Sequence, residues 1–114
     1  MAPQVKLPNA GQAFVEITKL REYSLSPQHK EGRHKARVFA SALGLGVSDA
    51  DWLCERLKAA VRERECQLGK KTPYGQRYLL DFSLTHGEKT ALLRSVWNVR
   101  PGEDSPRLVT CYVL

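Results

Sequence analysis

Residues suited to chemistry gather in one short segment, 28–37, with the sequence QHKEGRHKAR. Four of its ten residues are Lys or Arg, two are histidines, and one, Glu31, is acidic. A histidine can accept or donate a proton near neutral pH, and cationic side chains can hold a phosphate group. The segment therefore predicts a site that binds a phosphate, moves a proton, or does both.

The same segment is expected to lie in a turn and at the start of a helix. Backbone N–H groups in the first turn of a helix have no helical partner and, together with the helix dipole, attract anions. Cations at that position oppose the dipole, so folding alone does not favour them there. A bound phosphate would compensate, whereas the structural alternative is a solvated, charged turn.

A second polar group is expected on the strands of the C-terminal half. Arg94 lies between Leu92 and Val96 in an otherwise apolar segment, and a charge there needs a partner or a ligand. The structural alternative is an ion pair with Asp81 on the neighbouring strand. Aromatic and arginine side chains that alternate on a sheet also suit stacking on bases and contact with phosphates.

The elements that position these residues follow from hydrophobic spacing. Apolar residues recur at helical spacing in three stretches, 18–25, about 33–43 and about 50–61. Pro27 is expected to end the first helix and Gly44 the second. Ser48 and Asp51 fit a capping box that starts the third.

From residue 77 onward the hydrophobic period changes to two, which is typical of strands. Strands are expected over 77–84, 90–99 and 107–114, with turns at 86–89 and 101–104. The stretch 69–73 is expected to be a basic connector. Helices followed by antiparallel strands predict an α+β fold, with two to three N-terminal helices packed on a three- to four-stranded antiparallel β-meander.

The chain of 114 residues, with a formal net charge of +6, has the size of one domain. We expect a single domain over 1–114, with an extended lead-in over 1–12, a helical half over 13–66 and an antiparallel sheet over 74–114. No apolar run approaches the ~20 residues of a membrane span, and no signal-peptide core is present. The three cysteines show no C-x-x-C spacing, so we expect reduced thiols in a cytoplasmic protein that does not bind membranes.

Several kinds of catalytic site lose support. The sequence contains no P-loop, no glycine-rich dinucleotide motif, no nucleophile elbow and no recognisable carboxylate pair. His29 and His34, five residues apart across a glycine, fit no metal-binding helix motif, so we expect no metal and no cofactor. The basic, histidine and tyrosine residues still allow metal-independent cleavage of RNA. In that reaction the 2′-hydroxyl attacks the neighbouring phosphorus, a base takes its proton, and cations stabilise the developing charge.

Stretches along nearly the whole chain resemble a bacterial domain family of unknown function. They are LPNA at 7–10, KLREYSLSPQH at 19–29, GRHKARVF at 32–39, LGL at 43–45, YGQRY at 74–78, RSVWNVR at 94–100 and PRLVTCY at 106–112. Such domains occur as small stand-alone proteins beside a small partner gene and as C-terminal modules of larger toxins. The resemblance therefore implies a toxin with a small cognate antitoxin or immunity protein.

The order of helices before strands is also similar to that of the barnase, colicin and RelE-type ribonuclease superfamily, an analogy at the level of the fold. No glutamate of the barnase kind is obvious, so the general base stays open between His29 and His34. Carried over by position, the catalytic candidates are His29, His34, Lys35, Arg94, Thr110 and Tyr112. The candidates for nucleic-acid binding are Lys30, Arg33, Arg37, Tyr74, Arg77 and Arg100.

The main hypothesis is a metal-independent ribonuclease toxin that acts on cellular RNA. His29 or His34 would move the proton. Lys35, Arg33 and Arg94 would hold the phosphate charge, and Thr110 and Tyr112 would position the nucleotide. The alternative is a non-catalytic nucleic-acid or protein-binding module that uses the same basic face.

Overall fold

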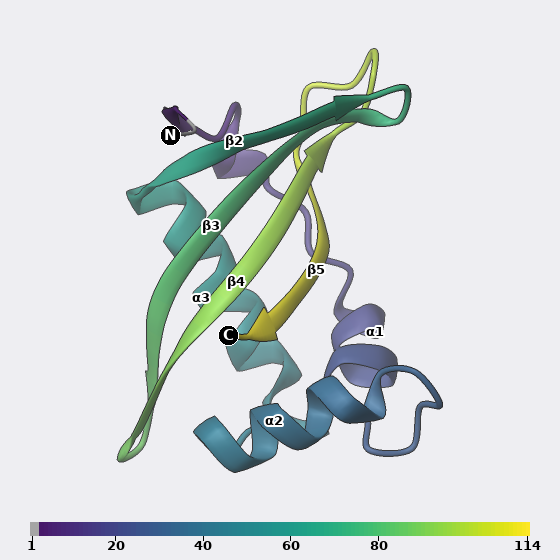
Figure 1. Ribbon diagram of the computed structural model, residues 1–114, viewed down its shortest axis with the longest axis vertical. Coiled ribbons are helices and arrows are strands. Elements are labelled where there is room, and N and C mark those ends of the chain that lie inside the picture. The colour runs from purple at the N-terminus through teal and green to yellow at the C-terminus, as the bar shows by residue number, and fades with distance from the viewer. Residues whose placement is uncertain (1–2) are drawn as a thin grey trace.

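The computed structural model describes residues 3–114, so Met1 and Ala2 of the predicted lead-in lie outside it. Its helical elements are the 3-10 turn η1 (Ala10–Gln12), α1 (Ile17–Lys19), the π-helical turn η2 (Leu20–Ser24), α2 (Arg33–Leu43), the 3-10 turn η3 (Val47–Asp49) and α3 (Ala50–Glu63). Its strands are β1 (Gln4–Lys6), β2 (Glu65–Thr72), β3 (Gly75–His86), β4 (Lys89–Val99) and β5 (Arg107–Val113). The predicted α+β class is confirmed, with helices mostly N-terminal and strands mostly C-terminal (Figure 1).

Within residues 3–114 the strands form one five-stranded sheet in the order β1-β2-β3-β4-β5, each pair antiparallel. The predicted meander is therefore present, but it has five strands instead of the expected three to four. The additional strands are β1 and β2. Most of the stretch 69–73, expected to be a connector, belongs to β2, and the lead-in supplies β1. We did not predict β2 from the sequence because the second half of this strand carries polar side chains on both faces. This removes the alternation that marks a half-buried strand.

The second predicted helix is confirmed as α2, which ends at Gly44 in the left-handed conformation (φ 66°). The predicted first helix is divided between α1 and η2. The capping box expected at Ser48 and Asp51 is wrong. Asp49 and Gly46 form it instead, with the Gly46 N–H donating to Asp49 Oδ2 and the Asp49 N–H to Gly46 O, each at 2.9 Å. The shift arises because η3 precedes α3 and moves the cap upstream.

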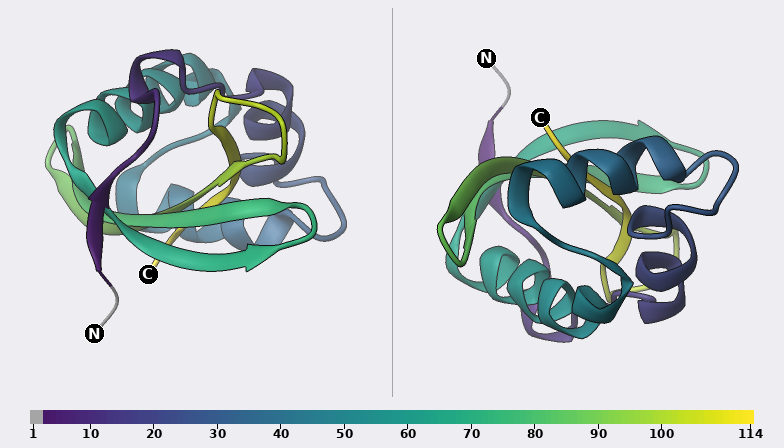
Figure 2. Two further views of the ribbon diagram at one scale, coloured as in Figure 1. Left: turned by 90° about the horizontal axis from the view of Figure 1, so that it is seen from above. Right: turned by 90° about the horizontal axis from the view of Figure 1, so that it is seen from below.

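The core lies between one face of the sheet and the helices. In Figure 1, α3 runs behind the sheet and α2 crosses its lower end, and Figure 2 shows the same layers from above and below. Trp97, fully buried on β4, donates its indole N–H to Ser95 Oγ at 3.0 Å, and Ser95 donates to Leu80 O at 2.9 Å. The opposite face is open, since Asp81 and Ser83 are exposed on it.

The tip of the β3–β4 hairpin is tied to the junction between α2 and α3. His86 Nδ1 lies 2.8 Å from Leu43 O at the end of α2, and the His86 ring packs on Trp52 with ring centroids 4.7 Å apart. Trp52 is half-buried in this contact. His86 therefore has a structural function, which its position in a turn did not indicate.

The start of α2 lies directly against η2. A Cβ atom placed on Gly32 would be 2.1 Å from Tyr23 O, closer than any side chain tolerates. Only a glycine permits this approach, and the approach brings Tyr23 beside the first turn of α2. The glycine of the basic segment is thus a packing requirement.

We expect Gly32→Ala to destabilise the fold by about 1–3 kcal/mol, because the added methyl group must push α2 away from η2. Gly11→Ala is the matched control, since a Cβ there meets no atom within 4 Å, and it should change stability by no more than about 0.5 kcal/mol. Urea unfolding followed by circular dichroism measures both. Equal midpoints for the two variants would show that the close approach does not constrain the fold.

Candidate functional site

Lys35, on α2, lies at the centre of the candidate site. Its ammonium donates to Thr110 Oγ1 on β5 at 3.1 Å. It also lies 5.3 Å from the ring centroid of Tyr23 and 5.4 Å from that of Tyr112, both within the range of cation–π attraction. Three predicted site residues, Lys35, Thr110 and Tyr112, are thus brought together from positions far apart in the chain.

His34 lies beside this group. With Lys35, Val38, Tyr112 and Val113 it lines a shallow cavity of about 270 Å³ between α2 and the end of β5. His34 is exposed, and no hydrogen bond engages its ring among the residues described. Both ring nitrogens are therefore open to a ligand in the cavity.

His29 is held in a different way. Its Nδ1 accepts two backbone N–H groups, from Glu31 at 3.0 Å and from Gly32 at 2.9 Å. The neutral ring must then carry its proton on Nε2, so the ring presents a donor. The ring also packs edge-on against Tyr23, with centroids 4.7 Å apart, so Tyr23 contacts both His29 and Lys35.

The start of α2 differs from what the sequence predicted. The expected compensation for cations at a helix start was a bound phosphate. In the structure the His29 ring occupies two of the N–H groups that such an anion would use. The His29 ring thus takes the place that an anion could occupy at these two N–H groups, and Lys35, which donates to Thr110, becomes the cation to consider.

Arg94 extends the site onto the open face of the sheet. It pairs with Asp81 through two hydrogen bonds of 2.8 Å, the ion pair named above as the structural alternative. The hydrogen bond to Asp81, and next the neighbouring Tyr112, raise the pKa of Arg94 above its ordinary value. Tyr112 is its direct cross-strand neighbour on β5. Arg94, held by Asp81, is thus suited to positioning the side chain of Tyr112.

The other predicted residues lie elsewhere. Arg33 and Arg37, one helical turn apart, line a separate cavity of about 380 Å³ with Leu25, Pro27 and Val47. Lys30 is exposed in the turn before α2. The helical period explains the division, because residues four apart share one face of α2 whereas Lys35 points toward β5.

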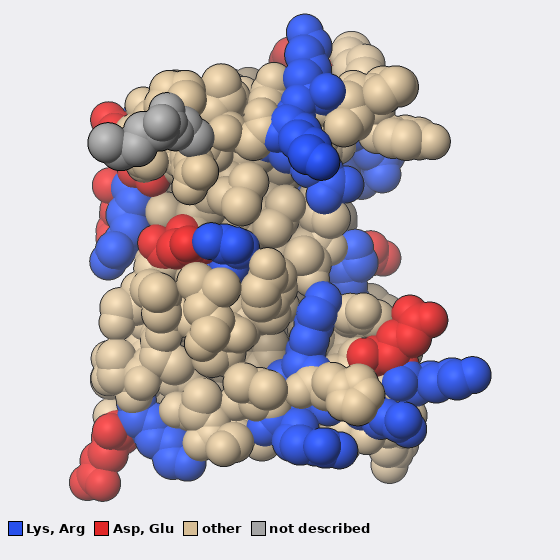
Figure 3. Space-filling view, viewed as in Figure 1, with Lys and Arg blue, Asp and Glu red and all other residues tan. Residues whose placement is uncertain are grey.

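The aromatic and basic residues at the β2–β3 turn form another group. Tyr74 is 79% exposed in that turn, and its carbonyl oxygen accepts from Asn98 Nδ2 at 3.0 Å. Arg77 pairs with Asn98 across β3 and β4, and Arg100 follows β4. These three residues lie at the end of the sheet opposite α2, so they do not touch the Lys35 group. Figure 3 shows basic side chains over both regions of this face.

The sequence prediction missed two residues of the site, Tyr23 and Val38. Tyr23 contacts Lys35 only because Gly32 lets η2 approach α2. Val38 is 43% exposed on α2 beside the His34 cavity. An apolar residue on the polar face of the predicted helix was the available signal for Val38, and no local pattern indicated Tyr23.

The cysteines take no part in the site. Cys111 is fully buried on β5, and burial raises the pKa of its thiol to about 12, although Lys35 and Ser24 act to lower it. Burial likewise raises the pKa of Cys66 to about 11. Both thiols are therefore protonated at neutral pH and poor nucleophiles. Among residues 3–114 no group of three or more His, Cys, Asp or Glu is arranged to hold a metal ion.

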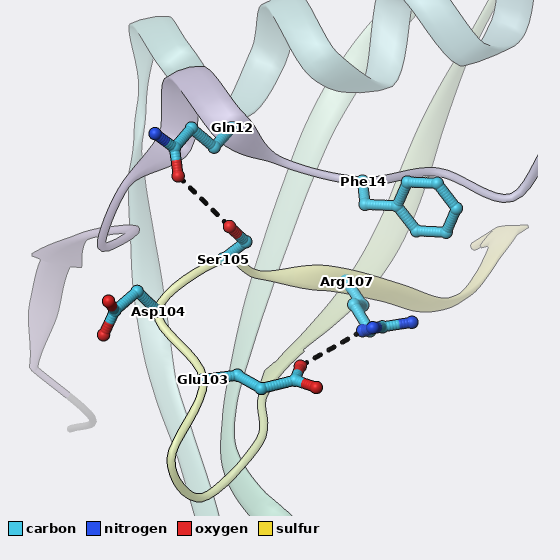
Figure 4. Close-up of a pocket in the computed structure, with 6 residues that line it drawn as sticks. All are labelled: Gln12, Phe14, Glu103, Asp104, Ser105 and Arg107. Carbon is cyan, nitrogen blue, oxygen red and sulfur yellow. Dashed lines mark hydrogen bonds and ion pairs between the residues drawn. The ribbon is translucent and has the colours of Figure 1, made fainter.

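A cavity of about 530 Å³ lies away from Lys35, next to the loop that precedes β5 (Figure 4). Glu103 pairs there with Arg107 at 3.3 Å, and Asp104 lines the same cavity. The two carboxylates make this a poor place for a phosphate.

The fold and the Lys35 group together define a small α+β domain with a cationic, aromatic site where α2 meets β5. Comparison with protein families matches residues 6–114 to the Domain of unknown function (DUF6883), and the chain belongs to this family. No curated protein and no solved structure matches the chain. No helix of residues 3–114 is long and apolar enough to cross a membrane.

We expect Cys111 to resist alkylation at pH 8 in the native protein, because a pKa of about 12 instead of 9.0 lowers its thiolate fraction about a thousandfold. Folding favours the neutral thiol, so this contribution to stability is present below pH 9 and is lost as pH rises toward 12. Iodoacetamide labelling with mass spectrometry, with the urea-unfolded chain as control, tests the first point. Native labelling as fast as in urea would contradict it.

Proposed function

We propose that the protein binds RNA at the Lys35 group and cleaves it without a metal ion. The observation that carries the proposal is the state of Lys35. Its ammonium is held by Thr110 and two aromatic rings, yet it forms no ion pair with a carboxylate anywhere in residues 3–114. A half-buried cation that is positioned but not neutralised is suited to an anionic ligand. The neighbouring tyrosines can stack against a base.

The proposed reaction needs only the groups already described. The neutral imidazole of His34 takes the proton of the 2′-hydroxyl, whose oxygen attacks the adjacent phosphorus. Lys35 stabilises the added negative charge. The bond to the 5′ oxygen then breaks, and that oxygen receives the proton from His34 through water. The products are a 2′,3′-cyclic phosphate and a 5′-hydroxyl, and the protein returns to its starting state.

The family resemblance supports a biological setting for this activity. A toxin acting on cellular RNA in the cytoplasm would need a small antitoxin or immunity protein. An acidic partner would complement a chain of net charge +6. The same face used for phosphate contacts without cleavage would make the protein a binding module, which the experiment below distinguishes.

We expect the purified protein to cleave RNA in EDTA, and Lys35→Gln to reduce the rate about 10²–10³-fold by removing the charge that stabilises the phosphorane. Lys6→Gln is the matched control, because Lys6 is exposed on β1 at the opposite edge of the sheet, and it should leave the rate unchanged. Gel analysis of cleaved RNA measures all three proteins. Intact RNA with the wild type, or equal rates for both variants, would refute the proposal.

His34→Ala should reduce the rate about 10²–10⁴-fold while RNA affinity falls little, because a proton acceptor is lost and a cation is not. Affinity is measured by fluorescence anisotropy on RNA whose 2′-hydroxyls are methylated, which cannot be cleaved by this route. Binding without any cleavage by the wild type would establish the binding module instead.

A further inference from the structure

We propose that a single-stranded RNA lies along β5 and the segment 14–24 that covers its outer edge, from the Lys35 group to Arg100 and Arg107. This inference rests on the proposed function and extends the site well beyond the reacting phosphate. It assigns binding roles to Lys19, Arg107 and Phe14, and it joins Arg100 to the Lys35 group.

The contacts along β5 follow one another in sequence order. Near its start, Phe14 forms a parallel bridge with Arg107, and the Arg107 guanidinium lies 5.6 Å from the Phe14 ring centroid. Lys19 Nζ donates to Val109 O at 3.1 Å. One residue further, Thr110 accepts from Lys35. Five residue steps separate Arg107 from Tyr112, about 17 Å of strand, which is longer than one nucleotide needs.

The hollows beside this edge are neighbours that share lining residues or contacts. A cavity of about 220 Å³ is lined by Lys19, Asn98, Arg100 and Arg107 among others, and one of about 280 Å³ by Lys19, Tyr23 and His29 among others. Lys19 and Glu16 line both, and Tyr23 joins the second cavity to Lys35. We call this row of hollows, from the His34 cavity to Arg100, the β5 groove.

Cations and rings alternate along the β5 groove. Lys35, Lys19, Arg107 and Arg100 supply the charges, and Tyr112, Tyr23 and Phe14 supply the rings. Glu16 and Glu22 also line it, and their carboxylates weaken the attraction of a phosphate to the stretch beside Lys19. Lys19 keeps two N–H donors beyond its bond to Val109, and Arg100 is exposed without an ion pair in residues 3–114.

Such a row of cations and rings fits an RNA strand whose bases are unpaired. Phosphates need successive cations, while exposed rings stack only on bases that are free of a duplex. Phe14 is 50% exposed, so part of its ring is open to a base.

On the side of Arg107, the groove does not extend into the next cavity, for an electrostatic reason. Phe14 and Arg107 also line the neighbouring large cavity, where Glu103 and Asp104 lie (Figure 4). These carboxylates repel a polyanion, and Glu103 neutralises part of the charge of Arg107. Glu103 thus limits both the length and the strength of binding.

The test measures anisotropy with 2′-O-methyl oligonucleotides of about eight nucleotides, as single strands and as duplexes, and with a dinucleotide. We expect Arg100→Gln and Lys19→Gln each to weaken binding of the single strand about 3–10-fold at low salt and to reduce the salt slope by about 1. The dinucleotide should be unaffected. Glu103→Gln should tighten binding of the single strand, and Lys6→Gln should change nothing.

The outcomes separate the two proposals. Binding that depends on Lys35 but is indifferent to Arg100, Lys19 and Glu103 overturns the β5 groove and leaves the reacting site standing. Duplex bound as tightly as single strand overturns the single-strand assignment. No binding or cleavage of any RNA overturns the proposed function itself.

Discussion

The outer edge of β5 imposes the constraint on which the rest of the structure depends. An edge strand carries backbone groups that the sheet leaves unpaired, and a protein must cover or satisfy them. Here Phe14 donates to Pro106 O and accepts from Leu108, both at 2.9 Å, and Lys19 donates to Val109 O. Covering this edge brings the segment from Phe14 to Ser24 alongside β5. The close approach at Gly32 then fixes α2 against that segment. The candidate site is the place where these two requirements meet.

The charged residues of the site differ in what already neutralises them. Arg94 and Asp81 satisfy each other on the open sheet face, with both side chains about one-third exposed (32% and 33%), so their pairing is worth little to stability. Lys35 has donors engaged but no opposite charge in residues 3–114. Arg94 is therefore suited to positioning its neighbours, whereas Lys35 is suited to binding an anion. Composition alone does not distinguish the two residues. The net charge of +6 says nothing about which cation is available.

Local periodicity was sufficient to predict much of the fold. The spacing of Ala36, Phe39 and Leu43 located α2, and alternation located the central strands. It could not reveal β2, which is polar on both faces, or the cap at Asp49. For the site, residue types selected Lys35, Thr110 and Tyr112, which the fold brings together. Tyr23, and the placement of Arg33 on a different face from Lys35, depend on tertiary contacts that no local pattern records.

The order of the strands has a consequence for how the protein matures. Every strand of the sheet pairs with its neighbour in sequence from β2 to β5, so hairpins of short loop length can build the meander quickly. The contacts that create the site join residues 75 positions apart (Lys35 to Thr110) and 90 apart (Lys19 to Val109). These long loops close late. The sheet from β2 to β5 is thus built from pairings between neighbours in sequence, whereas the Lys35 group needs segments from both halves of the chain in place at once.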